Sequence, residues 1–151
     1  MLALLAAAVL AVAADPRVTL GVANPVVTDA NVRTTICVSG WTKTVRPPVS
    51  YTDKLKRELL PPGANIADFE LDHVWPIEDG GDPKNPDNLR LQRWTGPDGA
   101  RAKDVVETAV HRAICAGTMT IAQGHAELAA WIEAHRPYEP LPLVLAGVAG
   151  R

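Results

Sequence analysis

The chain has 151 residues, which is enough for one domain with a hydrophobic core but short for two. Apolar residues make up 47% of it and aromatic residues only 5%, so the core is expected to be aliphatic. Thirteen prolines and eleven glycines argue against an all-helical bundle. The formal charge of -2 excludes a global attraction to nucleic acid, so any such binding requires a local basic patch.

The first fourteen residues, MLALLAAAVLAVAA, form an uninterrupted apolar run that ends in small residues before Asp15. This pattern predicts a secretory signal peptide over 1–14, since a membrane span needs about 20 apolar residues. An uncleaved anchor or a misassigned start is the alternative. Export to a secreted or periplasmic location leaves no stable membrane association after cleavage. It also favours a disulfide between Cys37 and Cys115, with two buried free thiols as the alternative.

The region before residue 69 shows few regular patterns. Residues 15–31 contain scattered prolines and asparagines and are expected to form a flexible linker. In 34–48, β-branched and aromatic residues on both sides of a Ser-Gly pair predict a hairpin or two short strands. Leucines on one side of 50–60 predict a short helix that ends before Pro61.

Two short stretches further along the chain alternate between apolar and polar residues. They run from Phe69 to Asp72 and from Leu89 to Gln92, and they flank a polar loop that contains Gly80 and Gly81. The alternation predicts two strands joined by that loop.

Two helices are expected after the second strand. Apolar residues recur at helical spacing from about Gly99 until Gly117. The pattern from Thr120 to Gln123 is typical of a capping box and predicts a last helix that ends at Arg136. Residues 137–151 are apolar and interrupted by prolines, so they are expected to form a poorly ordered tail.

The segment ELDHVWPIEDGGDPKNPDNLRL, residues 70–91, places Asp72 next to His73 and puts Asn88 just beyond a loop. Hydrolysis of a phosphodiester needs a base that takes a proton from water near neutral pH, and imidazole has its pKa there, which makes His73 the candidate general base. A divalent cation on oxygen ligands can stabilise the charge that develops on the phosphate, and Asp72 is the first candidate ligand.

The order of these features, strand, Asp-His, glycine-containing loop, strand and helix, resembles the HNH (His-Me finger) endonuclease family. LDHVWPIEDGG and NPDNLRL followed by GARAKD look similar to its small exported bacterial branch, strongly over 69–107 and more loosely from Cys37 to Trp131. The resemblance implies an α+β fold, with a ββα-metal (HNH) core in a domain at 32–136, flanking short strands and C-terminal helices. It also implies a divalent-metal-dependent endonuclease that uses Mg²⁺ or Mn²⁺.

The resemblance implies roles for individual residues as well. Asn88 would bond backbone groups across the loop and hold His73 in place. The family has an Asn or His at the start of the helix as a further metal ligand, whereas this chain has Gly99 there and Asp98 one residue earlier. Asp98 is the substitute we expect; a water in that position or a weakened site are the alternatives.

Nucleic acid is the expected partner. Arg90, Arg101 and Lys103 lie around the second strand and the start of the helix, where they are expected to track a phosphate backbone. Because no base-reading element stands out, we expect DNA, or RNA, to be cut with low sequence specificity. Oligomeric state is left open.

Two other interpretations stand beside the nuclease. Gly99 and the negative net charge favour an exported binding or interaction module that keeps a degenerate HNH fold without catalysis. A structural ion in the same element is the second, although zinc is poorly supported without a Cys or His cluster.

Overall fold

The computed structural model describes residues 21–140, so the predicted signal peptide and most of the predicted tail lie outside the described residues. Its elements in chain order are the 3-10 turn η1 (Val32–Thr34), helices α2 (Trp41–Val45) and α3 (Val49–Leu59), turn η2 (Ile66–Asp68), strand β1 (Phe69–His73), turns η3 (Ile77–Asp79) and η4 (Pro86–Asn88), strand β2 (Leu89–Arg93), and helices α4 (Ala100–Ala116) and α5 (Ile121–His135). The predicted α+β class is confirmed at the level of mixed helix and strand. None of the described helices is long and apolar enough to cross a membrane.

The sheet of the described region is an antiparallel hairpin of β1 and β2. Leu91 and Phe69 point to one face of the hairpin, where they pack with Leu59 of α3 in a buried cluster. Side chains alternate along a strand, so Glu70 and Asp72 point to the opposite face, toward α4. The hairpin therefore has an apolar face beside α3 and a polar face, with Glu70 and Asp72, beside α4.

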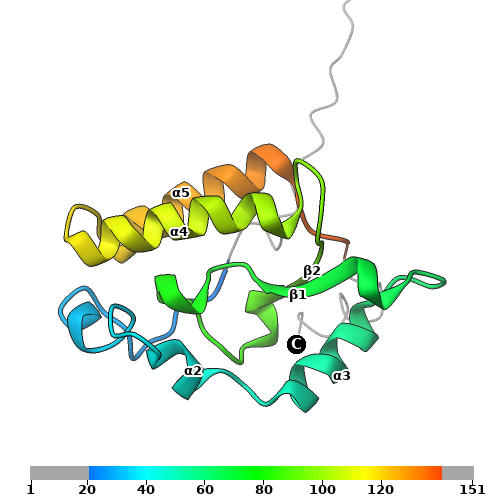
Figure 1. Cartoon of the computed structure of the whole chain (residues 1–151), viewed down its shortest axis with the longest axis horizontal. Helices are drawn as coiled ribbons and strands as arrows, with labels where there is room; N and C mark the ends of the chain where they lie inside the picture. The colour runs from blue at the N-terminus through cyan, green and yellow to red at the C-terminus, as the bar shows by residue number, and fades with distance from the viewer. Residues whose placement is uncertain (1–20, 141–151) are drawn as a thin grey trace, which may run out of the picture.

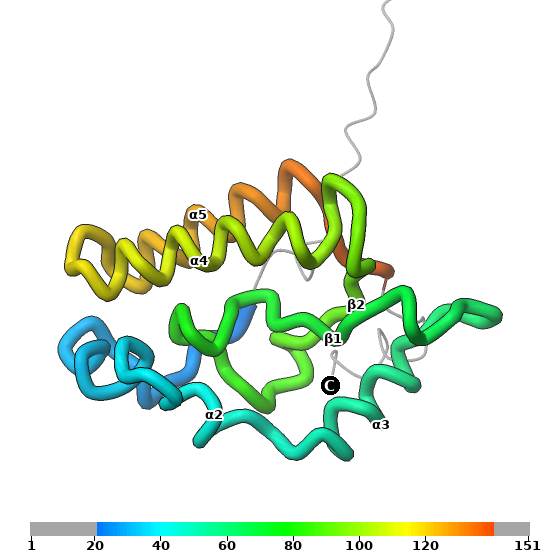
Figure 2. Tube along the Cα trace, in the orientation of Figure 1, coloured from blue at the N-terminus to red at the C-terminus, as the bar shows by residue number. Residues whose placement is uncertain are grey.

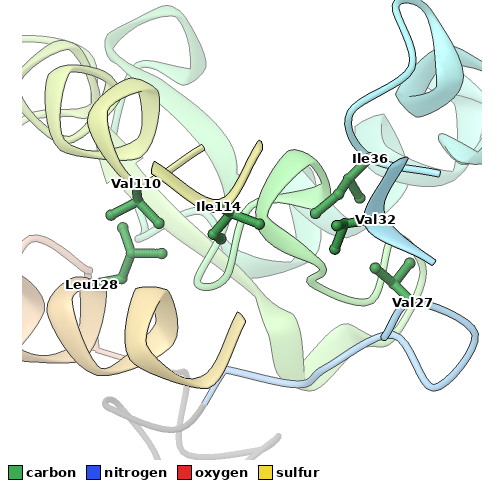
Figure 3. Packing of buried hydrophobic residues seen from close by; sticks show 6 residues of the cluster. All are labelled: Val27, Val32, Ile36, Val110, Ile114 and Leu128. Carbon is green, nitrogen blue, oxygen red and sulfur yellow. The ribbon is translucent and has the colours of Figure 1, made fainter. Parts of the chain in front are cut away.

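Helices α4 and α5 run antiparallel next to each other along one side of the molecule, while α3 lies on the other side of the hairpin (Figure 1). The capping box that opens α5 is confirmed, because the Thr120 hydroxyl accepts from the Gln123 amide and the Gln123 side chain accepts from the Thr120 amide. The main apolar cluster joins both helices to the N-terminal segment (Figure 3), through Val27, Val32, Ile36, Val110, Ile114 and Leu128.

Residues 21–31, which were expected to belong to a flexible linker, are packed against the rest of the domain. Val27 is buried in the main cluster, and Ala23 forms a bridge with Gly81. The Asn24 amide donates to Gly80 O at 2.8 Å, and the Asp82 amide donates to Val22 O at 2.7 Å. This segment, which contains proline and asparagine, lies beside the loop between β1 and β2 (Figure 2).

The strands expected within 34–48 are absent, and the prediction is wrong for this stretch. The segment forms turns and the short helix α2, which begins after Gly40 in the left-handed conformation, at φ 82°. Local bonds satisfy its amides, such as Val38 N to Thr35 O at 2.8 Å and Trp41 N to Val38 O at 3.0 Å. β-Branched residues indicated a strand, but tertiary contacts and turn bonds override that preference.

The predicted disulfide is confirmed, since Cys37 and Cys115 are bonded and link the turn region after η1 to α4. The start of the predicted tail is ordered. Tyr138 pairs with Gln92 at the edge of β2, and the Glu139 amide donates to Leu91 O at 3.0 Å. Backbone groups at the edge of β2 that do not pair with β1 thus bond to this segment.

Replacing both cysteines by serine should lower the free energy of unfolding by about 2–5 kcal/mol, because the bond joins residues 78 apart in sequence and restricts the unfolded chain. Urea unfolding with and without reductant measures the change. Reduced wild type should match the double variant, and a reduced protein that keeps the midpoint of the oxidised protein would contradict the expectation.

Candidate functional site

Asp72 and His73 end strand β1 and line a cavity of about 440 Å³ between the hairpin and α4. The backbone leaves the strand after His73, and Val74 N donates to Asn88 O at 2.8 Å. Two neighbouring side chains, which point to opposite faces in a regular strand, thus both line one cavity. The remaining lining residues are Arg46, Glu70, Leu71, Pro76, Ile77, Glu78, Asp104, Glu107 and Thr108.

The imidazole of His73 is held by one nitrogen. Its Nε2 lies 3.1 Å from the carbonyl oxygen of Pro83, and because a carbonyl only accepts, Nε2 carries the hydrogen and Nδ1 is the basic nitrogen. Burial lowers the pKa of His73, and this effect outweighs the Pro83 contact and the nearby Asp72, which raise it. The ring is therefore neutral near pH 7 and able to accept a proton.

The Asn88 side chain is completely buried and bonds four backbone groups. Its Oδ1 accepts from the amides of Val22 and Trp75, both at 3.0 Å. Its Nδ2 donates to the carbonyls of Trp75 at 3.0 Å and Asp82 at 2.9 Å. The amide joins the N-terminal segment, the chain after β1 and the loop that carries Pro83, so it fixes the surroundings of His73.

Glycine is required in the same loop. A Cβ on Gly81 would lie 1.8 Å from the Trp75 carbonyl oxygen, and Gly80 has a φ of +85°. Backbone passes so close to backbone here that a side chain has no room.

A buried lysine fixes the Asp72 carboxylate. The Lys103 ammonium, 1% exposed, lies 2.6 Å from Asp72 Oδ2, 2.6 Å from Glu107 Oε1 and 2.7 Å from the His73 carbonyl oxygen. The Tyr138 hydroxyl donates to the same Asp72 oxygen at 2.8 Å. Burial alone would lower the pKa of Lys103, but the two carboxylates raise it well above its usual range, so the ammonium stays charged.

The cavity has more carboxylates than cations. Glu70, Asp104 and Glu107 line it with Asp72. Burial, with the nearby charges of Asp72 and Asp104, raises the pKa of Glu70 to about 7. Burial likewise raises the pKa of Glu107 to about 8, although Lys103 opposes the change. Such shifts mark a pocket where further negative charge is unfavourable and a cation is favoured.

Carboxylate oxygens are the type of donor that a hard divalent cation prefers. In this structure, however, the side chains do not point to one common position. Within residues 21–140, no set of three or more His, Cys, Asp or Glu side chains is arranged so that it could hold a metal ion. Mg²⁺ usually keeps several waters and uses one or two carboxylates, so Asp72 with Glu70 or Asp104 would match it in the kind and number of donors.

Asp98, the expected substitute ligand, does not line this cavity. It is exposed in the turn before α4, and its backbone carbonyl accepts from the Gln92 side chain at 3.1 Å. A side chain at Gly99 is also excluded, because a Cβ there would lie 2.6 Å from the Thr95 backbone. Helix α4 instead contributes Asp104 and Glu107 to the lining, one and two turns further along.

The three predicted nucleic-acid contacts have different surroundings. Arg90 is 4% exposed, and its guanidinium donates to the carbonyls of Pro86 and Leu89, so it supports the loop from inside. Lys103 is buried against Asp72, as described above. Arg101 is exposed and lines a separate pocket of about 550 Å³ together with Arg93 and Trp94. Nothing in the sequence indicated that Arg90 and Lys103 are buried.

A second acidic group lies behind the cavity. Asp79 is fully buried in η3, and its Oδ1 lies 3.5 Å from Nδ1 of His111 on α4. That ring nitrogen lies closer, at 2.8 Å, to the Glu78 carbonyl oxygen, so the contact with Asp79 is electrostatic. Burial raises the pKa of Asp79 to about 6, and the Asp79 side chain raises the pKa of His111.

Several site residues had only weak sequence signals. The spacing of Lys103 and Glu107, four apart on a helix, and the alternation of Glu70 with Asp72 could have indicated shared faces. Nothing in the local sequence indicated Tyr138, which reaches Asp72 across 66 residues.

Comparisons of the chain with protein-family models, with curated proteins and with solved structures each found no match.

Replacing Asn88 by Ala should lower the free energy of unfolding by about 3 kcal/mol or more, because four buried backbone groups lose their partner. Urea unfolding followed by circular dichroism measures it. The control is Asn65→Ala, which removes one exposed bond to the Ala67 amide and should cost about 0.5–1 kcal/mol. Equal losses in the two variants would show that Asn88 does not organise the loop.

The buried Asp79 carboxyl should make stability depend on pH, because burial raises its pKa and the His111 contact only partly offsets that rise. Both pKa values are raised in the folded protein, so the native state binds more protons and this contribution is complete below the unfolded pKa of Asp79, 3.8. It should then decline by up to about 3 kcal/mol as the pH rises through about 6. Unfolding free energies of wild type and Asp79→Asn from pH 4 to 8 test this, and a constant difference between the two would refute it.

Proposed function

We propose that the protein is a divalent-metal-dependent endonuclease of the HNH type, which hydrolyses phosphodiester bonds of DNA or RNA with His73 as general base. The observation that carries the proposal is the His73 imidazole, held through Nε2 by the Pro83 carbonyl, which lines a carboxylate-rich cavity together with Asp72 at the end of β1. The order of hairpin and following helix agrees with the ββα element that the sequence resemblance implies.

His73 takes a proton from the attacking water at Nδ1 and becomes an imidazolium. The Pro83 carbonyl then still accepts from Nε2, so the ring keeps its orientation while its charge changes. Asn88 supports the step indirectly, because it holds the Asp82 carbonyl next to Pro83 and both backbone groups of Trp75. Lys103 bonds the His73 carbonyl and restrains the backbone of the base itself.

Asp72 is the proposed metal ligand, and Glu70 and Asp104 are the further carboxylates that the cavity offers. When bound, Mg²⁺ or Mn²⁺ supplies positive charge where the phosphate and the leaving oxygen become more negative. The excess of carboxylates supports a requirement for the cation, since without it the lining would repel a polyanion. Asp98 is not retained as a ligand because it lies outside the lining.

Substrate contacts come from the rim. Arg46 lines the cavity and is exposed, and Arg101 precedes Asp104 by one turn on the same side of α4. Arg101 also shares the neighbouring pocket with Arg93 and with Trp94, which is 37% exposed. Such groups suit phosphates and stacked bases of any sequence, which favours low specificity.

We also infer a secreted or periplasmic location. The Cys37–Cys115 bond supports it, since disulfides persist in oxidising compartments.

A non-catalytic exported module is the second candidate function. It is favoured by Lys103, whose ammonium already pairs with Asp72, and by the lack of space for a ligand at Gly99. Titration with Mn²⁺ separates the two: a nuclease binds one ion and loses it in Asp72→Ala, whereas a module of this kind shows no change.

Replacing His73 by Ala should reduce plasmid nicking about 10²–10⁴-fold in Mg²⁺ or Mn²⁺, because the base is lost. The assay follows conversion of supercoiled to open-circular DNA over time. His135→Ala is the matched control, since His135 contacts Trp131 at 2.8 Å and does not line the cavity. Equal nicking by wild type and His73→Ala would falsify the assignment of the base.

A further inference from the structure

Both side-chain contacts of the Asp72 carboxylate use the same oxygen. Lys103 Nζ lies 2.6 Å from Oδ2, and the Tyr138 hydroxyl donates to Oδ2 at 2.8 Å. Among residues 21–140, no side chain bonds the other oxygen, Oδ1. The Asp72 side chain is 12% exposed and lines the cavity. Two bonds to one oxygen fix the rotation of a carboxylate and leave the other oxygen for a ligand.

The segment that carries Tyr138 is held in a defined place. Helix α5 ends at His135, and the next residue, Arg136, has the left-handed conformation, with φ 49°, where the chain turns back toward the hairpin. Tyr138 then pairs with Gln92, and Glu139 forms an ion pair with Arg93 at 3.4 Å. The Tyr138 hydroxyl thus reaches Asp72 from the edge of β2, and Tyr138 is 9% exposed.

Lys103 and Tyr138 affect a cation at Asp72 in different ways. The ammonium orients the carboxylate but also repels a second positive charge. The phenol is neutral and orients the same oxygen without that repulsion. Removal of the Tyr138 hydroxyl therefore changes the orientation of the Asp72 carboxylate without changing the local charge. Removal of Lys103 would change both.

We propose that Tyr138 is a positioning residue that holds Asp72 Oδ2 so that Oδ1 is presented to the cavity as the ligand of the divalent cation. This inference rests on the proposed function. Partners of metal ligands that bond the distal atom typically change metal affinity or activity by about 10–100-fold when they are removed. The C-terminal segment after α5 is accordingly part of the site, although it contains no residue that touches the reacting atoms.

The test is Tyr138→Phe in the full chain, which keeps the ring and removes only the hydroxyl. Mn²⁺ binding, measured by electron paramagnetic resonance of the free ion, should weaken about 10–100-fold. Nicking at low Mn²⁺ should fall to a similar extent and recover at high Mn²⁺, because the base is intact. Tyr51→Phe is the matched control: its hydroxyl donates to the Lys84 carbonyl at 2.7 Å and not to Asp72, so its Mn²⁺ affinity should equal that of wild type.

The outcomes separate this inference from the proposed function. If wild type binds Mn²⁺ and nicks DNA while Tyr138→Phe binds Mn²⁺ equally well, the positioning role is overturned and the nuclease stands. If wild type neither binds Mn²⁺ nor nicks DNA, both proposals are overturned. A Tyr138→Phe protein with a lower urea midpoint but unchanged Mn²⁺ affinity also counts against the inference, because it shows a role in packing alone.

Discussion

The buried amide of Asn88 is the interaction on which the arrangement around His73 depends. It satisfies groups from three segments, at Val22, Trp75 and Asp82, which lie outside β1 and β2. Buried backbone groups without partners are costly, so a loop of this kind exists only where a side chain supplies the missing bonds. A single asparagine can do so because it carries both donors and acceptors.

Charge is the second constraint. Lys103 is buried together with Asp72 and Glu107, and a buried ammonium is tolerated only when its charge is paired and its hydrogens are bonded. The pairing does not add stability reliably, because desolvation offsets much of the attraction. Its consequence here is geometric: one ammonium joins α4 to the carboxylate and to the His73 carbonyl at the end of β1.

The sequence predicted those parts of the fold that local chemistry decides. Alternation located both strands, the capping box located α5, and Asp72, His73 and Asn88 indeed lie around one loop. Apart from the Cys37–Cys115 disulfide, features that depend on distant contacts were not predictable. Charge and position suggested that Arg90 and Lys103 contact a phosphate backbone, whereas packing buries both. The approach of Tyr138 depends on how the chain turns after α5.

The disulfide and the Asp79–His111 contact act on the same helix as Lys103. Cys115 and His111 lie one turn apart on α4, and they connect it to the N-terminal segment and to η3 respectively. Lys103 lies two turns before His111 and connects the helix to β1. Helix α4 is therefore fixed at three points, to the turn region around Cys37, to η3 and to β1, and the last two segments border the cavity. Because Asp104 and Glu107 lie between those points, the carboxylates that the helix contributes to the cavity belong to a restrained surface.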